Sequence, residues 1–557
     1  MRRTTIGKFV MQEGSFIRDV LRKGYRSRQK RIDWLLIIAL LLAALLLLTI
    51  NLGSLPLRDG DEGAIAQVAR HIWRTPSGSM DWLYQKIGDG TYDKKPPLIH
   101  LLVAWAYSLG GVSEWTTRLP GAILTAFSVP LLYGIAREIF CQRRSAIYSA
   151  LVYLMMLPVV RYGRLAMLDG SSVCFFLMML LCLLRSRRDL RYCLGVGISL
   201  GLISLTQGIF AILPTAVMLV FLFWDTPRLL FSYRMWTGIF IGMLPPIFWY
   251  SAQYLESGST FAILVTINQS LRRIWLVVGN HSGPPWYYLW EILKWTWPWL
   301  IFLPQSFRHV WHNRNLSWAK LILVWGGIYL LLISLMATKS PWYILPVYPS
   351  LALAVGAQLA YAENLENSDS FDSFTLLSAY PRIVVASFSI LAIMASGALL
   401  YFTWGKNPAT DLQLIFFAVA VTMALVAVKL ERGDREFLMV LFWGTYISLL
   451  LFVSSQYWIW ELQTAYSVKP VAAMIQNAKP SVPKIYTSFP YHRPSLDFYS
   501  DRTIVPASFG ELRYYWQFGE PKPYFLLDNE ALNDLQLQSA ELIDQANGWN
   551  LVTRNTN

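Results

Sequence analysis

The sequence contains little cysteine and little charge. Four of its 557 residues are cysteine, and they stand at unrelated spacings in or beside apolar runs: Cys141, Cys174, Cys182 and Cys193. This arrangement argues against a disulfide framework and against a thiolate metal site. Charged residues make up only 15% of the chain, whereas hydrophobic residues make up 55%. Soluble globular proteins rarely have this balance, and the recurring long apolar runs predict a polytopic α-helical membrane protein.

Acidic residues are also few, because 34 Asp and Glu stand against 48 Lys and Arg and leave a formal net charge of +14. A positive charge can indicate nucleic-acid binding. Here, however, the basic residues lie mostly between hydrophobic runs, which is the positive-inside pattern of membrane proteins. We therefore expect no nucleic-acid partner. The basic segment 1–33 fits either a cytoplasmic amphipathic helix on anionic lipid or a disordered tail.

No small-x-small cleavage site follows the first apolar run, residues 34–53, which is too long for a signal-peptide core and is predicted to be a retained span. Twelve further apolar runs lie at 119–138, 144–161, 169–185, 192–206, 208–224, 236–253, 286–304, 319–336, 342–361, 383–404, 412–430 and 437–456. Residues 96–112 are expected to form an interfacial or re-entrant helix, because the basic clusters near 137–144, 185–191 and 228–234 then all face the cytoplasm. The prediction is about thirteen spans in a bacterial inner membrane, with the N-terminus inside and the C-terminus outside.

Two outward connections of this membrane region, residues 34–458, are long. The first, about 55–118, is expected to hold two surface helices, one in "DEGAIAQVARHIWR" and one that starts at Pro96–Pro97. The second covers about 254–285. The polar segment 459–557 predicts a small α/β domain on the periplasmic face. Its expected elements are a helix near 470–478, strands at 484–489 and 503–508, a helix near 510–517, a strand at 524–528, a helix near 530–546 and a strand at 549–553.

Charged residues gather in the outward connections, where positive-inside statistics disfavour Lys and Arg. The residues of interest there are Arg58, Asp59, Asp61, Glu62, Asp93, Lys94, Lys95, Arg118, Arg161, Arg164, Asp169, Arg272, Arg273, His281, Lys339 and Tyr343. An anionic ligand at the outer membrane face explains the cations, and the carboxylates among them indicate acid–base chemistry. Glycosyl transfer from a lipid phosphate fits both features, because cations neutralise the departing phosphate while a carboxylate deprotonates the acceptor.

Six stretches, in order along the chain, resemble one known group of proteins. They are "GDEGAIAQVAR", "YDKKPPL", "EWTTRLPGAI", "RLAMLDG", "HSGPPWYYLWEILKWTWPW" and "TKSPWYILPVYPSLAL". The group is the polyprenyl-phosphate-dependent glycosyltransferases of GT-C fold, specifically the aminoarabinose transferase and protein O-mannosyltransferase-like superfamily. The resemblance implies a GT-C membrane domain, perpendicular surface helices and a periplasmic C-terminal α/β domain. One departure is Lys94, where aminoarabinose transferases usually carry an acidic residue.

The resemblance also implies roles for individual residues. Asp61 would be the catalytic base, with Glu62 as a second catalytic candidate, and Lys95 would bind the lipid phosphate. Further phosphate-binding candidates are Lys94, Arg164, Lys339 and Tyr343, and further site-lining candidates are Asp93, Arg118, Asp169 and His281. Structural roles are the alternatives, because acids can cap a helix N-terminus and lysines can anchor at the membrane interface.

The expected activity is inverting transfer of a sugar from a polyprenyl-phosphate donor to a hydroxyl or phosphate of an acceptor at the periplasmic face. The acceptor classes left open are a glycolipid such as lipid A, a protein and a polysaccharide. A transporter or flippase for a lipid-linked sugar is the alternative, and a partner-binding scaffold is a weaker one. Charges at span ends and the absence of an internal repeat disfavour the transporter. The protein is expected to act as a monomer; no cofactor is certain, and a divalent metal stays open.

Overall fold

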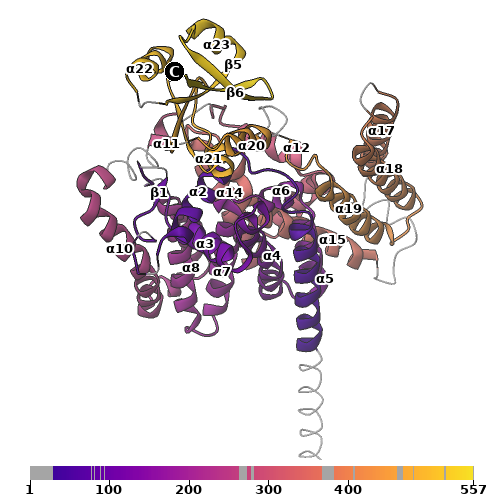
Figure 1. Ribbon diagram of the computed structural model, residues 1–557. Coiled ribbons are helices and arrows are strands. Elements are labelled where there is room, and N and C mark those ends of the chain that lie inside the picture. The colour runs from indigo at the N-terminus through magenta and orange to yellow at the C-terminus, as the bar shows by residue number, and fades with distance from the viewer. Residues whose placement is uncertain are drawn as a thin grey trace, which may run out of the picture.

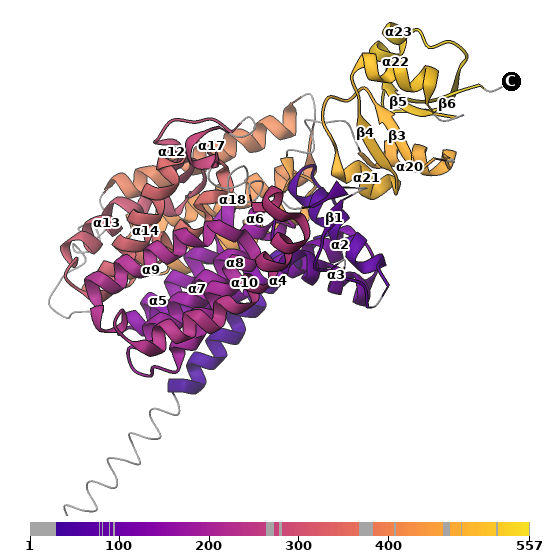
Figure 2. The same ribbon diagram turned by 90° about the vertical axis from the view of Figure 1, so that its left-hand side faces the viewer.

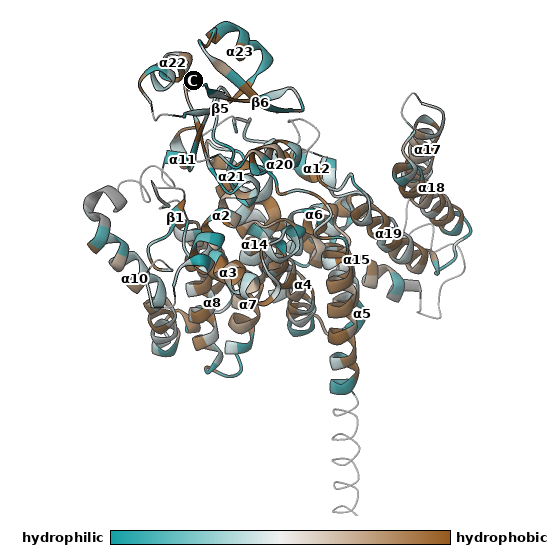
Figure 3. Cartoon of the chain, in the orientation of Figure 1, coloured by the Kyte–Doolittle hydropathy of each residue, from teal (hydrophilic) through white to brown (hydrophobic). Residues whose placement is uncertain are grey.

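The computed structural model describes residues 29–76, 78–80, 82–87, 90–92, 95–262, 272–277, 281–366, 382–405, 408–460, 468–480, 482–519 and 522–555. A bundle of apolar helices carries a smaller α/β domain at one end, drawn in yellow in Figures 1 and 2. Brown prevails on the helices of the bundle, whereas the C-terminal domain mixes teal and brown (Figure 3). The predicted segment 1–33 lies almost entirely outside the described residues.

The bundle helices match the predicted apolar runs closely. The first helix is Gln29–Thr49, and it is followed by α4 (Glu114–Ile139), α5 (Arg143–Leu154), α6 (Leu157–Arg164), α7 (Leu168–Ser186), α8 (Tyr192–Gln207), α9 (Ile212–Asp225), α10 (Tyr233–Ala262), α12 (Tyr287–Trp295), α13 (Leu303–His312), α14 (Ser317–Leu335), α15 (Tyr348–Glu366), α17 (Arg382–Trp404), α18 (Thr410–Glu431) and α19 (Phe437–Ser454). Among the described residues, nine helices are long and apolar enough to cross a membrane, or ten if the bent pair of α5 and α6 is one span. The protein is thus a multi-pass helical membrane protein.

One of the nine candidates, residues 192–225, is a hairpin of two helices. Gly208 breaks it with a φ of 63°, and the Arg187 guanidinium before α8 contacts Asp225 Oδ2 at the end of α9, at 2.6 Å. A straight helix of this length would hold its ends roughly 50 Å apart. The ion pair therefore requires the chain to reverse between α8 and α9. This agrees with the prediction of two separate apolar runs, 192–206 and 208–224.

Small residues allow α8 and α10 to pack closely. Gly197 and Gly201 face Gly238 and Gly242, and a Cβ at Gly197 would lie 1.8 Å from the Gly238 carbonyl oxygen. Glycines four residues apart on both helices let the backbones touch, which is a frequent solution for helix packing in membranes. Helix α10 continues to Ala262, beyond the predicted start of the second long connection at 254.

Helices are present at both positions where surface helices were predicted, and their place on the membrane surface stays a prediction. Helix α2 is Asp61–Arg74 and helix α3 is Leu98–Gly110, which follows the double proline. They bury a shared apolar core that includes Ile65, Ala69 and Val103. Helix α3 is too short to rank among the candidate spans, and the two helices lie next to the C-terminal domain (Figure 2).

The C-terminal domain is a five-stranded sheet with the order β4-β3-β5-β7-β6. Strands β3, β4 and β5 are parallel, and β7 is antiparallel to both β5 and β6. The strands are β3 (Lys484–Thr487), β4 (Thr503–Pro506), β5 (Tyr524–Asp528), β6 (Ala540–Ala546) and β7 (Trp549–Arg554); the helices are α20 (Val468–Ala478), α21 (Pro494–Ser500), α22 (Phe509–Phe518) and α23 (Asn529–Leu535).

The prediction of a helix near 530–546 is wrong in its second half. Helix α23 ends at Leu535, where Gln536 and Ser539 take positive φ values of 45° and 55°, and residues 540–546 form β6. Asn547 and Gly548 also have positive φ and join β6 to β7, because an Asn-Gly pair fits the two-residue turn of a hairpin. Strand β6 is an edge strand with mostly exposed residues, so its polar composition lacked the alternation that identifies a strand. Helix α21 was not predicted at all.

Candidate functional site

An ion pair between the two surface helices forms the centre of the site. Lys95 Nζ lies 2.6 Å from Asp61 Oδ1, and their side chains are 24% and 29% exposed. Asp61 is the first residue of α2 and follows Gly60, whose φ of 79° makes the turn into the helix. Lys95 precedes the double proline at the start of α3. The two predicted residues are therefore in contact and remain reachable from outside.

The charges around this pair shift both groups in a consistent direction. Lys95 holds the pKa of the Asp61 carboxyl below its ordinary value of 3.8, against the opposing effect of burial, and Arg58 and Arg273 act in the same direction as Lys95. Burial lowers the pKa of the Lys95 ammonium, but Asp61 and Tyr92 more than offset it and the net pKa is raised. Both groups are thus held in their charged forms.

A second carboxylate stands beside this pair. Asp169, at the start of α7, interacts electrostatically with both Lys95 and Asp61, and its Oδ1 accepts a hydrogen bond from Gln207 Nε2 at 2.9 Å. Gln207 is the last residue of α8. The site therefore draws on both surface helices and on two helices of the bundle.

The second long connection reaches the same site through Arg273. Its guanidinium donates to the Tyr343 hydroxyl at 2.8 Å and acts electrostatically on Asp61. Backbone hydrogen bonds join this connection to the segment before α15, from Thr338 N to Arg273 O at 3.1 Å and from Lys339 N to His281 O at 2.9 Å. The His281 ring stands edge-on to Trp342 at 5.7 Å. Tyr343 and His281 thus lie on the same side of the molecule as the ion pair.

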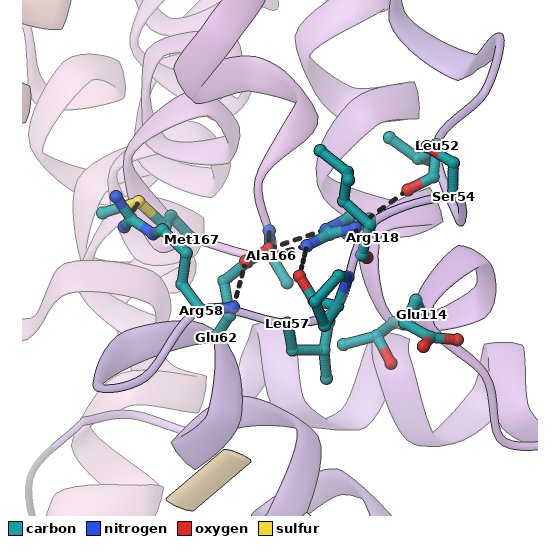
Figure 4. Close-up of polar contacts among 12 residues, drawn as sticks. Leu52, Ser54, Leu57, Arg58, Glu62, Glu114, Arg118, Ala166 and Met167 are labelled. Atoms are coloured by element: carbon teal, nitrogen blue, oxygen red, sulfur yellow. Dashed lines mark hydrogen bonds and ion pairs between the residues drawn. The ribbon is translucent and has the colours of Figure 1, made fainter. Parts of the chain in front are cut away.

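Glu62 is next to Asp61 in sequence but is completely buried, as is Arg118. Figure 4 shows Glu62 between Arg118 and the backbone of Ala166. Its oxygens accept from Arg118 Nε at 2.9 Å, Arg118 Nη2 at 3.0 Å, Arg58 N at 2.9 Å and Ala166 N at 2.8 Å. The remaining Arg118 donors bind the carbonyls of Leu52, Leu55 and Pro56. Each Glu62 oxygen thus accepts two hydrogen bonds within a buried contact, and a catalytic role for Glu62 stays a prediction.

Arg164 and Lys339 cap helix ends. The Arg164 guanidinium donates to Leu47 O at 2.9 Å and Ile50 O at 2.7 Å at the end of the first helix, and stacks 4.5 Å from the Trp458 ring. Lys339 Nζ donates to the carbonyls at the end of α14, Ser334 O at 2.5 Å and Ile333 O at 3.3 Å. The Ile333 carbonyl also accepts a backbone hydrogen bond from Met336 N at 3.3 Å. Both cations thus donate to backbone carbonyls at helix ends, and a role for them in phosphate binding stays a prediction.

Two predicted site residues, Asp93 and Lys94, lie outside the described residues. Sequence reasoning noted Arg58 and Arg273 as external cations but did not place them in the site, and it missed Tyr92 and Gln207. The signal for the two arginines was their position against the positive-inside rule. Among the residues that the structure describes, no three His, Cys, Asp or Glu side chains are grouped so as to hold a metal ion.

The bundle also holds an apolar cavity, which is open on one side, since its lining residue Ile212 is 64% exposed. It has a volume of about 430 Å³ and is formed by the hairpin of α8 and α9 together with α10; its lining includes Leu200, Ile212, Met243 and Tyr250. Gly208 belongs to this lining, and a Cβ there would lie 2.7 Å from the Tyr250 hydroxyl and 3.6 Å from Pro96 Cγ. One lining residue of the cavity therefore lies close to the proline that follows Lys95.

Comparison with known proteins gives similar sequences among glycosyltransferases. The sequence model of the family described as dolichyl-phosphate-mannose-protein mannosyltransferase matches residues 94–249. An undecaprenyl phosphate-alpha-4-amino-4-deoxy-L-arabinose arabinosyl transferase of Pseudomonas fluorescens is 27% identical over 308 residues, which cover 54% of this chain and 55% of the relative. The counterpart from Aeromonas salmonicida is 26% identical over 410 residues, 70% of this chain and 72% of the relative. The chain thus spans little more than half the length of the first of these relatives.

The fold has a clear counterpart among solved structures. The crystal structure of ArnT from Cupriavidus metallidurans bound to undecaprenyl phosphate superimposes with a TM-score of 0.75 at 18% identity, over 93% of this chain and 98% of that chain. The apo form of the same protein gives a TM-score of 0.71. At this identity the likeness shows the fold, and it agrees with the resemblance seen in the six motifs. The chain is thus similar in sequence to aminoarabinose transferases over about half of its length or more, and it shares the fold of ArnT.

Proposed function

We propose that this protein is an integral membrane glycosyltransferase that moves a sugar from a polyprenyl-phosphate donor to an acceptor. The observation that carries the proposal is the contact between Lys95 Nζ and Asp61 Oδ1, at 2.6 Å. It combines a carboxylate that can take a proton with a cation that can hold a phosphate. The related proteins are named as undecaprenyl phosphate-alpha-4-amino-4-deoxy-L-arabinose arabinosyl transferases, which supports the same reaction class.

Each residue of the pair has one role in the proposed reaction. Asp61 takes the proton from an acceptor hydroxyl, or from the P–OH of an acceptor phosphate, and the freed oxygen attacks the anomeric carbon. The bond between that carbon and the phosphate oxygen breaks on the opposite side, so the configuration inverts. The electron pair stays on the polyprenyl phosphate, whose negative charge Lys95 and Arg273 stabilise.

The resting ion pair also provides a way to activate the base. Without donor, Lys95 keeps the pKa of Asp61 low, which makes it a weak base. A donor phosphate that binds Lys95 shares its charge and weakens its hold on Asp61. The pKa of Asp61 then rises toward its ordinary value, so that base strength increases only when donor is present.

The donor lipid would lie in the cavity between α8, α9 and α10. Its apolar lining suits isoprene units, and because the lining residue Gly208 lies near Pro96, a lipid held there would bring its phosphate toward Lys95. A lipid-binding cavity leading to a charged end also suits a flippase. The charged groups of this site, however, gather at one end of the bundle instead of near its middle, where transporters place their sites.

For the membrane arrangement we propose thirteen spans, with Asp61, Lys95 and the C-terminal domain on the periplasmic face of a bacterial inner membrane. The number follows when the helices of the 192–225 hairpin are counted separately and when α5 with α6, α10, and α12 with α13 each count as one span. Cys141 is exposed between α4 and α5 and would face the cytoplasm. In intact cells a membrane-impermeant maleimide should then label a Gly510→Cys variant and leave Cys141 unmodified until the cells are permeabilised; the reverse result contradicts this arrangement.

The activity itself is tested by comparing cells with and without the protein. Mass spectrometry of glycolipids and envelope proteins should show a sugar on one acceptor class only when the protein is present, and the purified protein should transfer it from a polyprenyl-phosphate sugar in vitro. Proteoliposomes in which a lipid-linked sugar crosses the bilayer without being transferred would favour the flippase instead.

A further inference from the structure

We propose that the C-terminal domain positions the turn of residues 59–61, which we call the catalytic turn. Arg493, at the start of helix α21, holds Asp59 and thereby fixes Asp61 two residues later. This inference rests on the proposed role of Asp61 as the base. It makes Asp59 and Arg493 positioning residues, which touch neither donor nor acceptor, and it makes transfer dependent on docking of the C-terminal domain.

The contact occupies both carboxylate oxygens of Asp59. Arg493 Nε donates to Asp59 Oδ2 at 2.5 Å, and the Ser495 hydroxyl donates to Asp59 Oδ1. The Arg493 side chain is only 4% exposed. An ion pair shielded from water in this way is stronger and more selective in geometry than a surface pair. Only Gly60, with its positive φ, separates this clamp from Asp61.

The backbones of α21 and α2 also touch directly at this point. A Cβ at Gly63 would lie 2.5 Å from Ser495 N and 3.0 Å from Pro494 C. Gly63 stands in the first turn of α2, two residues after Asp61. The absence of a side chain there lets α21 rest on the first turn of the helix that carries the base.

Further contacts continue along the same surface. The Tyr499 hydroxyl accepts from Leu57 N at 2.9 Å and donates to Glu114 at 3.0 Å, while Arg70 donates to Phe498 O at 2.7 Å. The catalytic turn is thus held from both sides, by the buried Glu62–Arg118 pair toward the bundle and by α21 toward the C-terminal domain. An error of about 1 Å in the position of a catalytic group can lower a rate by about 100-fold.

The structure contains a matched control for simple docking. Arg74 and Asp501 form a second ion pair between α2 and the C-terminal domain, at 2.7 Å, but at the far end of α2 and with side chains 52% and 46% exposed. Arg74 is about 20 Å along the helix from Asp61. A variant at this pair weakens the same interface without disturbing the turn.

The test compares Arg493→Gln with Arg74→Gln in the full-length protein. Arg493→Gln should lower kcat at least tenfold with little change in KM for the polyprenyl-phosphate sugar, since Lys95 is untouched. It should also speed amide hydrogen exchange in the peptide that contains residues 57–66. Arg74→Gln should leave both quantities near wild type, and Arg493→Lys should restore part of kcat because it retains the charge.

The outcomes separate this inference from the proposed function. Unchanged exchange in Arg493→Gln overturns the positioning role, whatever its activity. Equal loss of kcat in Arg493→Gln and Arg74→Gln also overturns it, because docking alone would then explain the effect. If the wild-type protein transfers no sugar and Arg493→Gln still shows faster amide exchange, the coupling of α21 to the turn is supported and the proposed function is rejected.

Discussion

Asp61 and Lys95 are 34 residues apart in sequence and in direct contact in space, with Lys95 Nζ 2.6 Å from Asp61 Oδ1. The contact joins the N-terminal ends of two surface helices. Each group keeps the other charged, so a change at either residue alters both. The following predictions use this dependence and the contacts around it.

Asp61→Asn should abolish transfer while the donor still binds. Loss of a general base lowers a rate by about 10²- to 10⁴-fold, whereas removal of the carboxylate frees Lys95 for the lipid phosphate. Transfer assays and binding of a polyprenyl phosphate to the purified protein measure the two effects separately. The control is Asp501→Asn, which changes an exposed acid of the C-terminal domain that pairs with Arg74 at the other end of α2. Full activity in Asp61→Asn refutes its role as the base.

Lys95→Ala should weaken binding of the polyprenyl phosphate by about tenfold or more, because a charge-assisted contact to a phosphate is worth roughly 1.5–3 kcal/mol. Lys95→Arg retains the charge and should bind more tightly than Lys95→Ala. Titration with the lipid phosphate measures both, and Lys479→Ala, at an exposed lysine of the C-terminal domain, is the control. Equal affinity in wild type and Lys95→Ala would exclude Lys95 from the phosphate site.

The pH profiles of kcat/KM and kcat should differ on their acidic sides. The pKa of Asp61 in the free protein lies below 3.8, so the base stays ionised as the pH falls through the mildly acidic range and kcat/KM stays flat there. Once donor phosphate shares Lys95, the pKa of Asp61 rises, and kcat should begin to fall at a higher pH than kcat/KM. Steady-state assays across this range test the prediction, since the two parameters report the free and the bound protein. Coincident profiles would show that donor binding leaves Asp61 unchanged.

Glu62→Ala should destabilise the protein where Asp61→Asn does not. It leaves the buried Arg118 without its charge partner, and breaking a buried ion pair costs about 3–5 kcal/mol. Thermal unfolding in detergent should show a marked fall for Glu62→Ala and for Arg118→Met, and the double variant should lose less than the two single losses together. A Glu62→Ala protein with wild-type stability and no activity would return Glu62 to the catalytic candidates.

Gly63→Ala should lower thermal stability and loosen the C-terminal domain, because the added Cβ meets the backbone of Ser495 at 2.5 Å. Gly510 in α22 offers the matched control, since a Cβ there meets nothing within 4 Å. Gly510→Ala should be neutral or stabilising by about 0.5–1 kcal/mol. Thermal unfolding, and limited proteolysis between the helical bundle and the C-terminal domain, measure the difference between Gly63→Ala and Gly510→Ala. Equal behaviour of the two variants would mean that α21 can shift away from α2 at little cost.

Much of this fold could be predicted from local sequence. The long apolar runs identified the bundle helices, and the double proline with helical periodicity identified α2 and α3. The failures were also local. Residues 540–546 were predicted as helix because an exposed edge strand lacks an apolar alternation, although the Asn547–Gly548 pair that follows was a usable hairpin signal. Helix α21 has only seven residues, and its packing partner is more than 400 residues away in the chain, at the start of α2.

The sequence by itself determined the membrane character and the positions of helices α2 and α3, because hydrophobic periodicity is a property of local sequence. The choice of Asp61 and Lys95 as candidate site residues came from the resemblance of their motifs to a known family. Only the tertiary structure decided which of two neighbouring carboxylates stays partly exposed and which is buried. Asp61 and Glu62 are adjacent in sequence, yet helix geometry turns one toward Lys95 and the other into a closed contact with Arg118. Burial and hydrogen-bond partners depend on segments that the folded chain brings together, and no single stretch contains that information.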